Sequence, residues 1–224
     1  MEVISFMQLI LPYFILFIVV LQILLKKNSK KNDEKINQFW ERERKANEVR
    51  KKDISNLNYI VIPNDLLPDR NLSDNTLENS SDSFTTAIFT IPEIKEAYYL
   101  FASFYDKKMF NLNNCSNTDI KMEYGAANLT IMSEYDDNFI AMCKAAVKLA
   151  NAFDKNGMIE KAVPYLEFIV KSGTDISSAY LMLANYYIKI NDTKGIDNLK
   201  LYASSLNSLT KDIILKKLEQ TVST

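Results

Sequence analysis

Few side chains in this sequence have the chemistry that catalysis or metal binding requires. Histidine, the usual general base near neutral pH and a common zinc ligand, does not occur among the 224 residues. Its absence removes Ser-His and Cys-His nucleophile pairs. The four glycines are isolated from one another, so the sequence has no phosphate-binding glycine loop. We therefore expect a protein that is not an enzyme and that has no cofactor and no metal site.

The remaining reactive groups suit structural roles. Cys115 and Cys143 are too far apart for a C-x-x-C pair and too few for a disulfide framework, which favours a reducing compartment. Cys143 lies in an apolar helical context and is expected in the core, whereas Cys115 lies in an Asn-rich turn and is expected to be a thiol without a function. Asp136 and Asp137 are adjacent, so their side chains point in different directions on a helix, and we expect them to begin one.

The overall composition is that of an ordinary globular chain. It has 27 basic and 28 acidic residues, which argues against a surface built to neutralise nucleic-acid phosphates. With 47% apolar and 25% charged residues, the chain is long enough for one core of moderate size and appended segments. We expect no nucleic-acid partner.

The longest apolar run is at the N-terminus, where Val3 to Leu25 form 23 residues without a charge. As a helix they would extend roughly 34 Å, enough to cross a hydrocarbon core of about 30 Å. Pro12 and two glutamines interrupt the run but are tolerated in a membrane helix. The alternative is a secretory signal peptide, but the sequence lacks a positive region before the run and a small-residue cleavage site after it. We predict a single transmembrane anchor over residues 1–25.

A cluster of lysines follows the apolar run at once: Lys26, Lys27, Lys30 and Lys31. By the positive-inside rule, this cluster remains in the cytoplasm while the short N-terminus lies outside the cell membrane. The same lysines are predicted to contact anionic lipid headgroups, at about 1 kcal/mol each. The chain is thus predicted to be a single-pass membrane protein with a cytoplasmic C-terminal domain.

The basic stretch after the anchor has helical signals. Residues 26–53 are predicted to form a basic juxtamembrane helix, because Glu-Lys pairs four residues apart accompany a narrow apolar stripe. Trp40 lies on this stripe. It is either an interfacial anchor or a residue that packs on the body of the protein or on a partner helix.

The C-terminal part of the chain begins after a linker. Residues 54–90 are predicted to be an extended segment followed by a flexible linker, since residues 69–85 are rich in Asn, Ser and Asp and lack apolar periodicity. Residues 91–224 are predicted to be a helical domain. Its first helix is expected to start at Pro92, a residue that suits the first helical turn.

A repeat with a period of 34 residues organises this helical domain. The first copy holds Ala146, Leu149, Ala150, Asn151, Phe153 and Lys155, and the second holds Tyr180, Leu183, Ala184, Asn185, Tyr187 and Lys189. A fixed period of this length indicates stacked helical hairpins with a continuous core. The small residues at 150 and 184 are expected to let two helices approach closely. The alternative is an unrelated stack of hairpins with a coincidental period.

The stretch KAVPYLEFIV at residues 161–170, with Gly157 before it, closely resembles the second helix of a tetratricopeptide repeat. The resemblance covers about residues 143–206. The family's packing signature falls here on Leu149, Ala150, Phe153, Gly157, Ala162 and Leu166. Thr174 stands where the family commonly has proline, and Asn191 stands in place of glycine. The predicted fold is therefore all-α, with one N-terminal transmembrane helix followed by a TPR-like antiparallel array of helix hairpins.

The same resemblance implies that the first helix of each unit lines a groove for a peptide or protein partner. The groove-facing positions are Lys144, Val147, Asn151 and Lys155 in the first unit and Ser178, Leu181, Asn185 and Lys189 in the second. Their amides and ammonium groups suit a peptide backbone or an acidic C-terminus. The simpler interpretation is that Lys and Asn are common in this chain and have no role there. We expect a membrane-tethered interaction adaptor, and the alternative is an accessory subunit that joins a membrane complex through its transmembrane helix.

Overall fold

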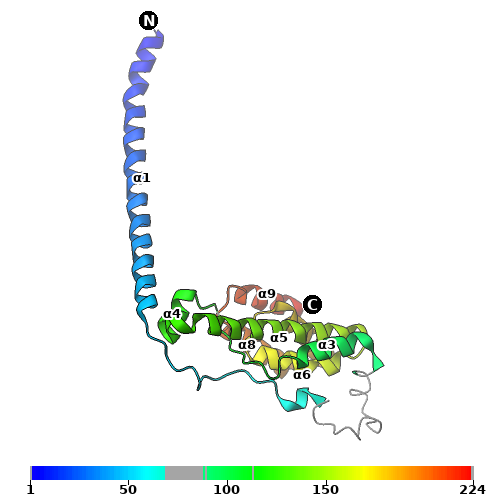
Figure 1. Cartoon of the computed structure of the whole chain (residues 1–224). Coiled ribbons are helices and arrows are strands. Elements are labelled where there is room, and N and C mark those ends of the chain that lie inside the picture. Colours follow the sequence, from blue (N-terminus) through cyan, green and yellow to red (C-terminus); the bar gives the residue numbers. More distant parts are fainter. Residues whose placement is uncertain (1, 69–87, 89, 113, 223–224) are drawn as a thin grey trace. The chain divides into compact units, whose positions relative to one another are not determined.

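The N-terminal apolar run and the basic stretch after it form one continuous helix. The computed structural model describes residues 2–68, 88, 90–112 and 114–222, and the side chains of residues 2–12, 28 and 222 lie outside this description. Helix α1 runs over Glu2–Glu48 (Figure 1). Near its end, Lys45 Nζ lies 2.8 Å from Glu41 Oε1, a pairing across one helical turn. The predicted anchor and the predicted juxtamembrane helix are therefore parts of a single element.

The apolar part of α1 is exposed along its described length. From Tyr13 to Leu25, every apolar side chain is exposed, with exposed fractions between 37% and 71%. Residues 3–12 of the predicted anchor lie outside the described side chains. In the part of the chain that the structure describes, none of the helices is both long and apolar enough to cross a membrane.

Contacts along the chain divide it into two units. The stem unit comprises residues 1–52 and 117–127, and the body unit comprises residues 53–116 and 128–224. In the stem unit, α4 (Asn117–Tyr124) packs against α1. The chain therefore returns to the end of its first helix after more than sixty residues.

Charged side chains join α4 to the last turns of α1. Glu43 forms an ion pair with Lys121 and accepts a hydrogen bond from Thr118 Oγ1 at 2.6 Å. Arg42 forms a second ion pair with Asp119. Thr118 is buried, and the side chains of Glu43 and Lys121 are less than one-fifth exposed. The hydrogen bonds to the Glu43 carboxylate from Lys121 and Thr118 hold its pKa below the usual value.

Backbone hydrogen bonds close the same joint. The Lys52 N–H donates to the Tyr124 carbonyl at 3.1 Å, and the Ala126 N–H donates to the Val49 carbonyl at 3.2 Å. Gly125 lies between these bonds with a φ of +91°. A Cβ at this position would lie 2.3 Å from the Arg50 carbonyl oxygen, so the turn requires glycine.

The body unit is built of helices. Within the described ranges, the other regular feature is an isolated antiparallel bridge between Ile60 and Met109, and the predicted all-α class is confirmed. The helices of the body unit are α3 (Pro92–Ala102), α5 (Leu129–Lys155), α6 (Ile159–Lys171), α7 (Ser177–Lys189), α8 (Thr193–Ser205) and α9 (Lys211–Val222). Helix α5 packs between α3 and α6, α6 packs on α7, and α8 and α9 both contact α7 (Figure 1).

The 34-residue period is visible at the ends of α5 and α7. Gly157 after α5 has a φ of +72°, and the Met158 N–H donates to the Phe153 carbonyl at 2.9 Å. Thirty-four residues later, Asn191 has a φ of +57°, and the Asp192 N–H donates to the Tyr187 carbonyl at 2.8 Å. Both ends have the hydrogen bond of a Schellman motif. Asn191 can replace glycine because asparagine tolerates left-handed backbone conformation better than most residues.

The repeated apolar positions form the centre of the core. The side chains that are fully buried are Ala146, Leu149, Ala150 and Phe153 on α5 and Tyr180, Leu183 and Ala184 on α7. Cys143 lies one turn before Ala146 and is also buried, as predicted. Burial raises the pKa of the Cys143 thiol to about 12.

The chain before α3 is attached to this core. The Ile60 N–H donates to the Met109 carbonyl at 2.9 Å, and Ile62 is buried. A short helical turn, η1 (Asn64–Leu66), follows, and the Tyr165 hydroxyl of α6 donates to the Leu66 carbonyl at 3.0 Å. The polar stretch at residues 69–85, predicted to be a flexible linker, lies outside the described residues.

Replacing Gly125 by alanine is expected to open the joint of the stem unit. The new Cβ would meet the Arg50 carbonyl oxygen, and the positive φ adds strain of about 1–2 kcal/mol. Hydrogen exchange should then speed up at the Lys52 and Ala126 amides, whose hydrogen bonds close the joint. Gly157→Ala is the matched control, because its φ is also positive but nothing lies within 4 Å of the added Cβ. Equal effects of the two substitutions at these amides would contradict the account.

The two thiols are expected to react differently. At pH 8 the Cys143 thiol, with its pKa raised to about 12, is almost fully protonated, and burial keeps reagents away from it. Cys115 is exposed. Iodoacetamide should therefore modify one site in the folded chain and two in urea, as counted by mass spectrometry. In the Cys115→Ser control the folded chain should remain unmodified, and fast modification of Cys143 there would contradict its burial.

Candidate partner-binding surface

The predicted groove residues of the first repeat lie on one face of α5. Lys144, Asn151 and Lys155 are exposed, and steps of seven and four residues correspond to whole turns of a helix. Lys148 lies on the same face. We call these four residues the α5 stripe. The Lys144 and Asn151 side chains form no hydrogen bond or ion pair with a described residue.

The other two lysines of the α5 stripe are paired with α3. Lys148 Nζ lies 2.6 Å from Glu96 Oε1, and Lys155 Nζ lies 2.9 Å from Glu93 Oε1. The later residue of α5 pairs with the earlier residue of α3, so the two helices are antiparallel. The hydrogen bond and the charge of Lys148 lower the pKa of Glu96. These pairs are exposed, so water screens them and they add little stability. The Lys155 ammonium nevertheless already pairs with a carboxylate of the same chain, that of Glu93.

The predicted groove residues of the second repeat lie at a hollow in the surface. Asn185 and Lys189 of α7 help to line a cavity of about 220 Å³, which we call the groove cavity. Its lining is Asp154, Ile159, Met182, Asn185, Tyr186 and Lys189. Ile159 and Met182 are partly buried against the core and supply apolar surface. The Asn185 and Lys189 side chains are exposed and form no hydrogen bond or ion pair with a described residue.

The groove cavity meets α5 at Asp154, a residue that the repeat did not indicate. Among the described residues that line it, neither Asn151 nor Lys155 is present. Asp154 is one residue before Lys155, about 100° away around the helix. The side of α5 at this cavity therefore differs from the α5 stripe, part of which pairs with α3. A repeat pattern does not reveal this difference, because it shows which positions correspond but not how each helix is rotated against its neighbours.

The dimensions and groups of the groove cavity suit one side chain of a peptide. Its volume is below the range of about 300–1,000 Å³ that is usual for small-molecule and cofactor sites. Ile159 and Met182 can contact an apolar side chain. The Asn185 amide can both donate to and accept from a peptide backbone, and Lys189 can pair with a carboxylate. Asp154, which lines the cavity from α5, repels a carboxylate of the peptide that comes close to it.

A second hollow has a structural role. It measures about 80 Å³ and lies among α6, α7 and α8, where Glu167, Lys171 and Tyr187 face it. Glu167 accepts hydrogen bonds from the Tyr187 hydroxyl at 2.7 Å and from Lys171 Nζ at 2.9 Å. Burial and the Glu167 carboxylate raise the pKa of Tyr187. The first repeat has Phe153 in place of Tyr187, so Glu167 accepts from a hydroxyl that the first copy lacks.

The acidic pair at 136 and 137 does not begin a helix, contrary to expectation. Helix α5 begins at Leu129, well before it. Asp136 accepts a hydrogen bond from the Leu112 N–H at 3.0 Å, and partial burial raises its pKa. Asp136 therefore attaches the preceding loop to α5. In the described residues, no group of three or more Cys, Asp or Glu side chains is arranged to hold a metal ion.

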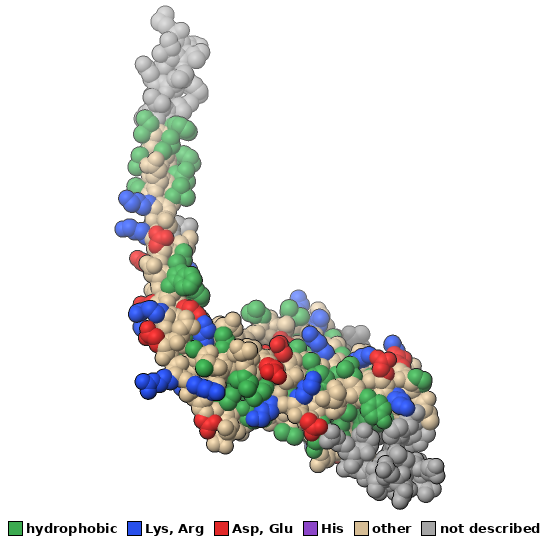
Figure 2. All heavy atoms as spheres, viewed as in Figure 1, with side chains coloured by type: hydrophobic (Ala, Val, Ile, Leu, Met, Phe, Trp, Pro, Cys, Tyr) green, Lys and Arg blue, Asp and Glu red, His purple; other side chains and the backbone are tan. Residues whose placement is uncertain are grey.

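The predicted lipid-contacting residues lie in the stem unit. Lys26, Lys27, Lys30 and Lys31 are exposed on α1 directly after the apolar segment that ends at Leu25. Figure 2 shows this change along α1 from hydrophobic to basic side chains. The predicted lipid contacts therefore belong to the stem unit, and the groove cavity belongs to the body unit. No protein-family model, no curated protein and no solved structure matches this chain.

Proposed function

We propose that this chain is a membrane-tethered interaction protein that presents a TPR-like groove to a peptide or protein partner at the cytoplasmic face of the cell membrane. One observation carries the proposal. Every apolar side chain from Tyr13 to Leu25 is exposed on all sides of α1. A helix that is apolar all round is normally covered by lipid or by protein.

Removing this apolar segment from water releases a large free energy. Twelve apolar side chains, each about half exposed, are in this segment. At about 25 cal/mol per Å² of apolar surface, removing them from water yields on the order of 20 kcal/mol. This exceeds the whole folding stability of many domains, about 5–15 kcal/mol. A transmembrane anchor over Val3 to Leu25 would remove this apolar surface from water by placing it in lipid.

The lysines after Leu25 support one orientation. Lys26, Lys27, Lys30 and Lys31 are exposed and lie within two turns of α1. Moving this cluster across a bilayer is costly, so the positive-inside rule keeps it in the cytoplasm. Anionic headgroups then lie within reach of the ammonium groups, which adds an electrostatic attraction that salt weakens.

The groove cavity supports the interaction role. Asn185 and Lys189 have no polar partner among the described residues, while Ile159 and Met182 offer apolar contact beside them. An exposed ammonium and an exposed amide next to an apolar hollow match a peptide segment with one apolar side chain and a nearby carboxylate. Tethering to the membrane raises the effective concentration of a partner that is itself at the membrane.

Photo-crosslinking of the full chain in native membranes tests this proposal. The photoreactive residue p-benzoylphenylalanine is placed at Tyr186, which lines the groove cavity, and in a control chain at Tyr99, which is 42% exposed on α3. We expect a discrete adduct with a cytoplasmic protein or peptide from position 186 and none from position 99. Lys189→Glu should reduce the adduct roughly tenfold, because a charge-assisted hydrogen bond is worth about 1.5–3 kcal/mol.

Three results of this experiment would contradict the proposal. Equal adducts from both positions would show that the groove cavity is not selective. An adduct from position 186 that Lys189→Glu leaves unchanged would show that Lys189 does not contribute to partner binding. Adducts that form only with other membrane helices would favour the alternative, an accessory subunit of a membrane complex.

A further inference from the structure

One face of α1 lacks charged residues over five turns. Successive steps of three and four residues place on this face Gln22, Leu25, Ser29, Asn32, Ile36 and Phe39. All six side chains are exposed. The charged residues between positions 26 and 42 lie on the rest of the helix circumference. We call this face the α1 seam.

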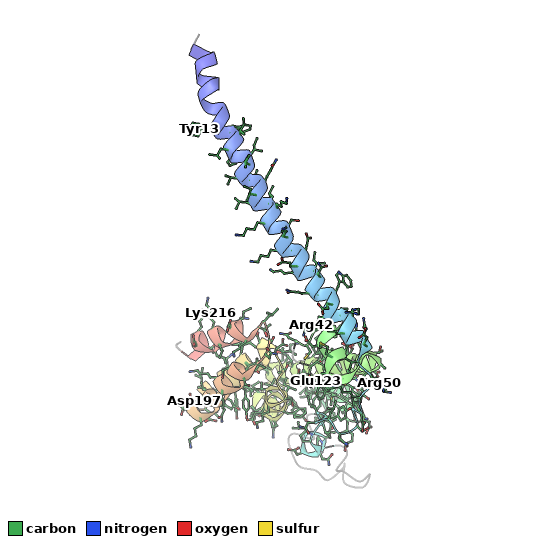
Figure 3. The ribbon with its side chains drawn as sticks, turned by 90° about the vertical axis from the view of Figure 1, so that its left-hand side faces the viewer. Tyr13, Arg42, Arg50, Glu123, Asp197 and Lys216 are labelled. Atoms are coloured by element: carbon green, nitrogen blue, oxygen red, sulfur yellow. The ribbon has the colours of Figure 1, made fainter. Side chains whose placement is uncertain are left out.

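At the C-terminal end of α1, the same face packs against α4. Continuing the steps leads to Glu43, which pairs with Lys121 of α4, and to Ala46, which is buried. From Tyr13 to Trp40, in contrast, every apolar side chain of α1 is exposed (Figure 3). The α1 seam is thus the uncovered continuation of a face that already packs on a helix.

We propose that the α1 seam binds the α1 seam of a second copy of this chain, as a parallel pair in register. The inference rests on the proposed membrane anchor, since two chains inserted in the same orientation can pair only in parallel. In register, each Asn32 lies opposite its counterpart, and the two amides donate to and accept from each other. A register shift would leave both amides buried without a partner, so this pair favours the in-register arrangement.

Charges beside the α1 seam are compatible with self-association. In a parallel pair, a residue on one flank faces the residue five positions later on the other flank of the second helix. This rule pairs Lys26 with Leu21, Lys35 with Trp40 and Arg42 with Asn47. Like charges therefore do not meet at these positions. Lys35 instead faces the exposed Trp40 ring, a cation–π arrangement, and this contact gives Trp40 a role on a partner helix.

The α1 seam is short, so the pairing of two chains depends on their confinement to one membrane. Eighteen helical residues extend about 27 Å, a short contact for a stable dimer in dilute solution. Confinement of two anchored chains to one bilayer raises their effective concentration and compensates for the small contact. The apolar segment before Gln22 can continue the pairing inside the bilayer.

Disulfide crosslinking of the full chain in native membranes tests the pairing. The background is Cys115→Ser, in which the remaining Cys143 is buried. Ser29→Cys places a thiol on the α1 seam, and the matched control Lys31→Cys places one two residues away on the opposite side of the same helix. Under mild oxidation we expect a dimer of this chain several-fold more abundant from Ser29→Cys. Adding Ile36→Asp should reduce that dimer to the control level.

Alkaline carbonate extraction of the same samples separates the two proposals. Extraction of the chain from membranes would contradict the anchor and hence the proposed function. Retention in the membrane with equal dimer yields from Ser29→Cys and Lys31→Cys would overturn the pairing alone. Crosslinking of Ser29→Cys to a different protein, with no dimer of this chain, would overturn it as well.

Discussion

Apolar side chains of α5 face α3 on one side and α6 on the other, and the body unit is arranged around that burial. Ala146 and Ala150 let the neighbouring helices approach, and Phe153 fills the next layer. The same physical demand is not met in the stem unit. There, Tyr13 to Leu25 remain exposed, although their apolar surface is comparable in kind to the core of the body unit. One requirement, the removal of apolar surface from water, thus explains why the body unit folds on itself and is the reason that we propose a lipid covering for α1.

The period of the sequence predicted much of this core, because burial repeats with the turns of a helix. Leu149 and Leu183, thirty-four residues apart, are both fully buried, and Gly157 and Asn191 end their helices in the same left-handed conformation. The sequence did not predict the joint between α1 and α4. Its ion pair, Glu43 with Lys121, connects residues that no periodic pattern relates. The continuity of α1 through Lys26 was missed for another reason, since a change from apolar to basic composition resembles a boundary even where helical propensity is uninterrupted.

The candidate site was predicted in part. Asn185 and Lys189 do line a cavity, and the resemblance to a tetratricopeptide repeat had pointed to both positions. Lys155 was placed in the same groove by analogy, but it pairs with Glu93 of α3, because the rotation of α5 directs it there. Asp154 entered the cavity for the same reason. An acidic residue directly before Lys155 was the available signal in the sequence.

The central claim is that lipid covers the apolar segment of α1, and site-directed spin labelling of the full chain in lipid bilayers tests it most directly. In the Cys115→Ser background, a nitroxide is attached at Phe17→Cys within the segment or at Lys31→Cys after it. Collision rates with oxygen, which concentrates in lipid, are then compared with those of a water-soluble nickel complex. The account predicts that oxygen dominates at position 17 and the nickel complex at position 31. Equal access of the nickel complex to both positions would contradict it.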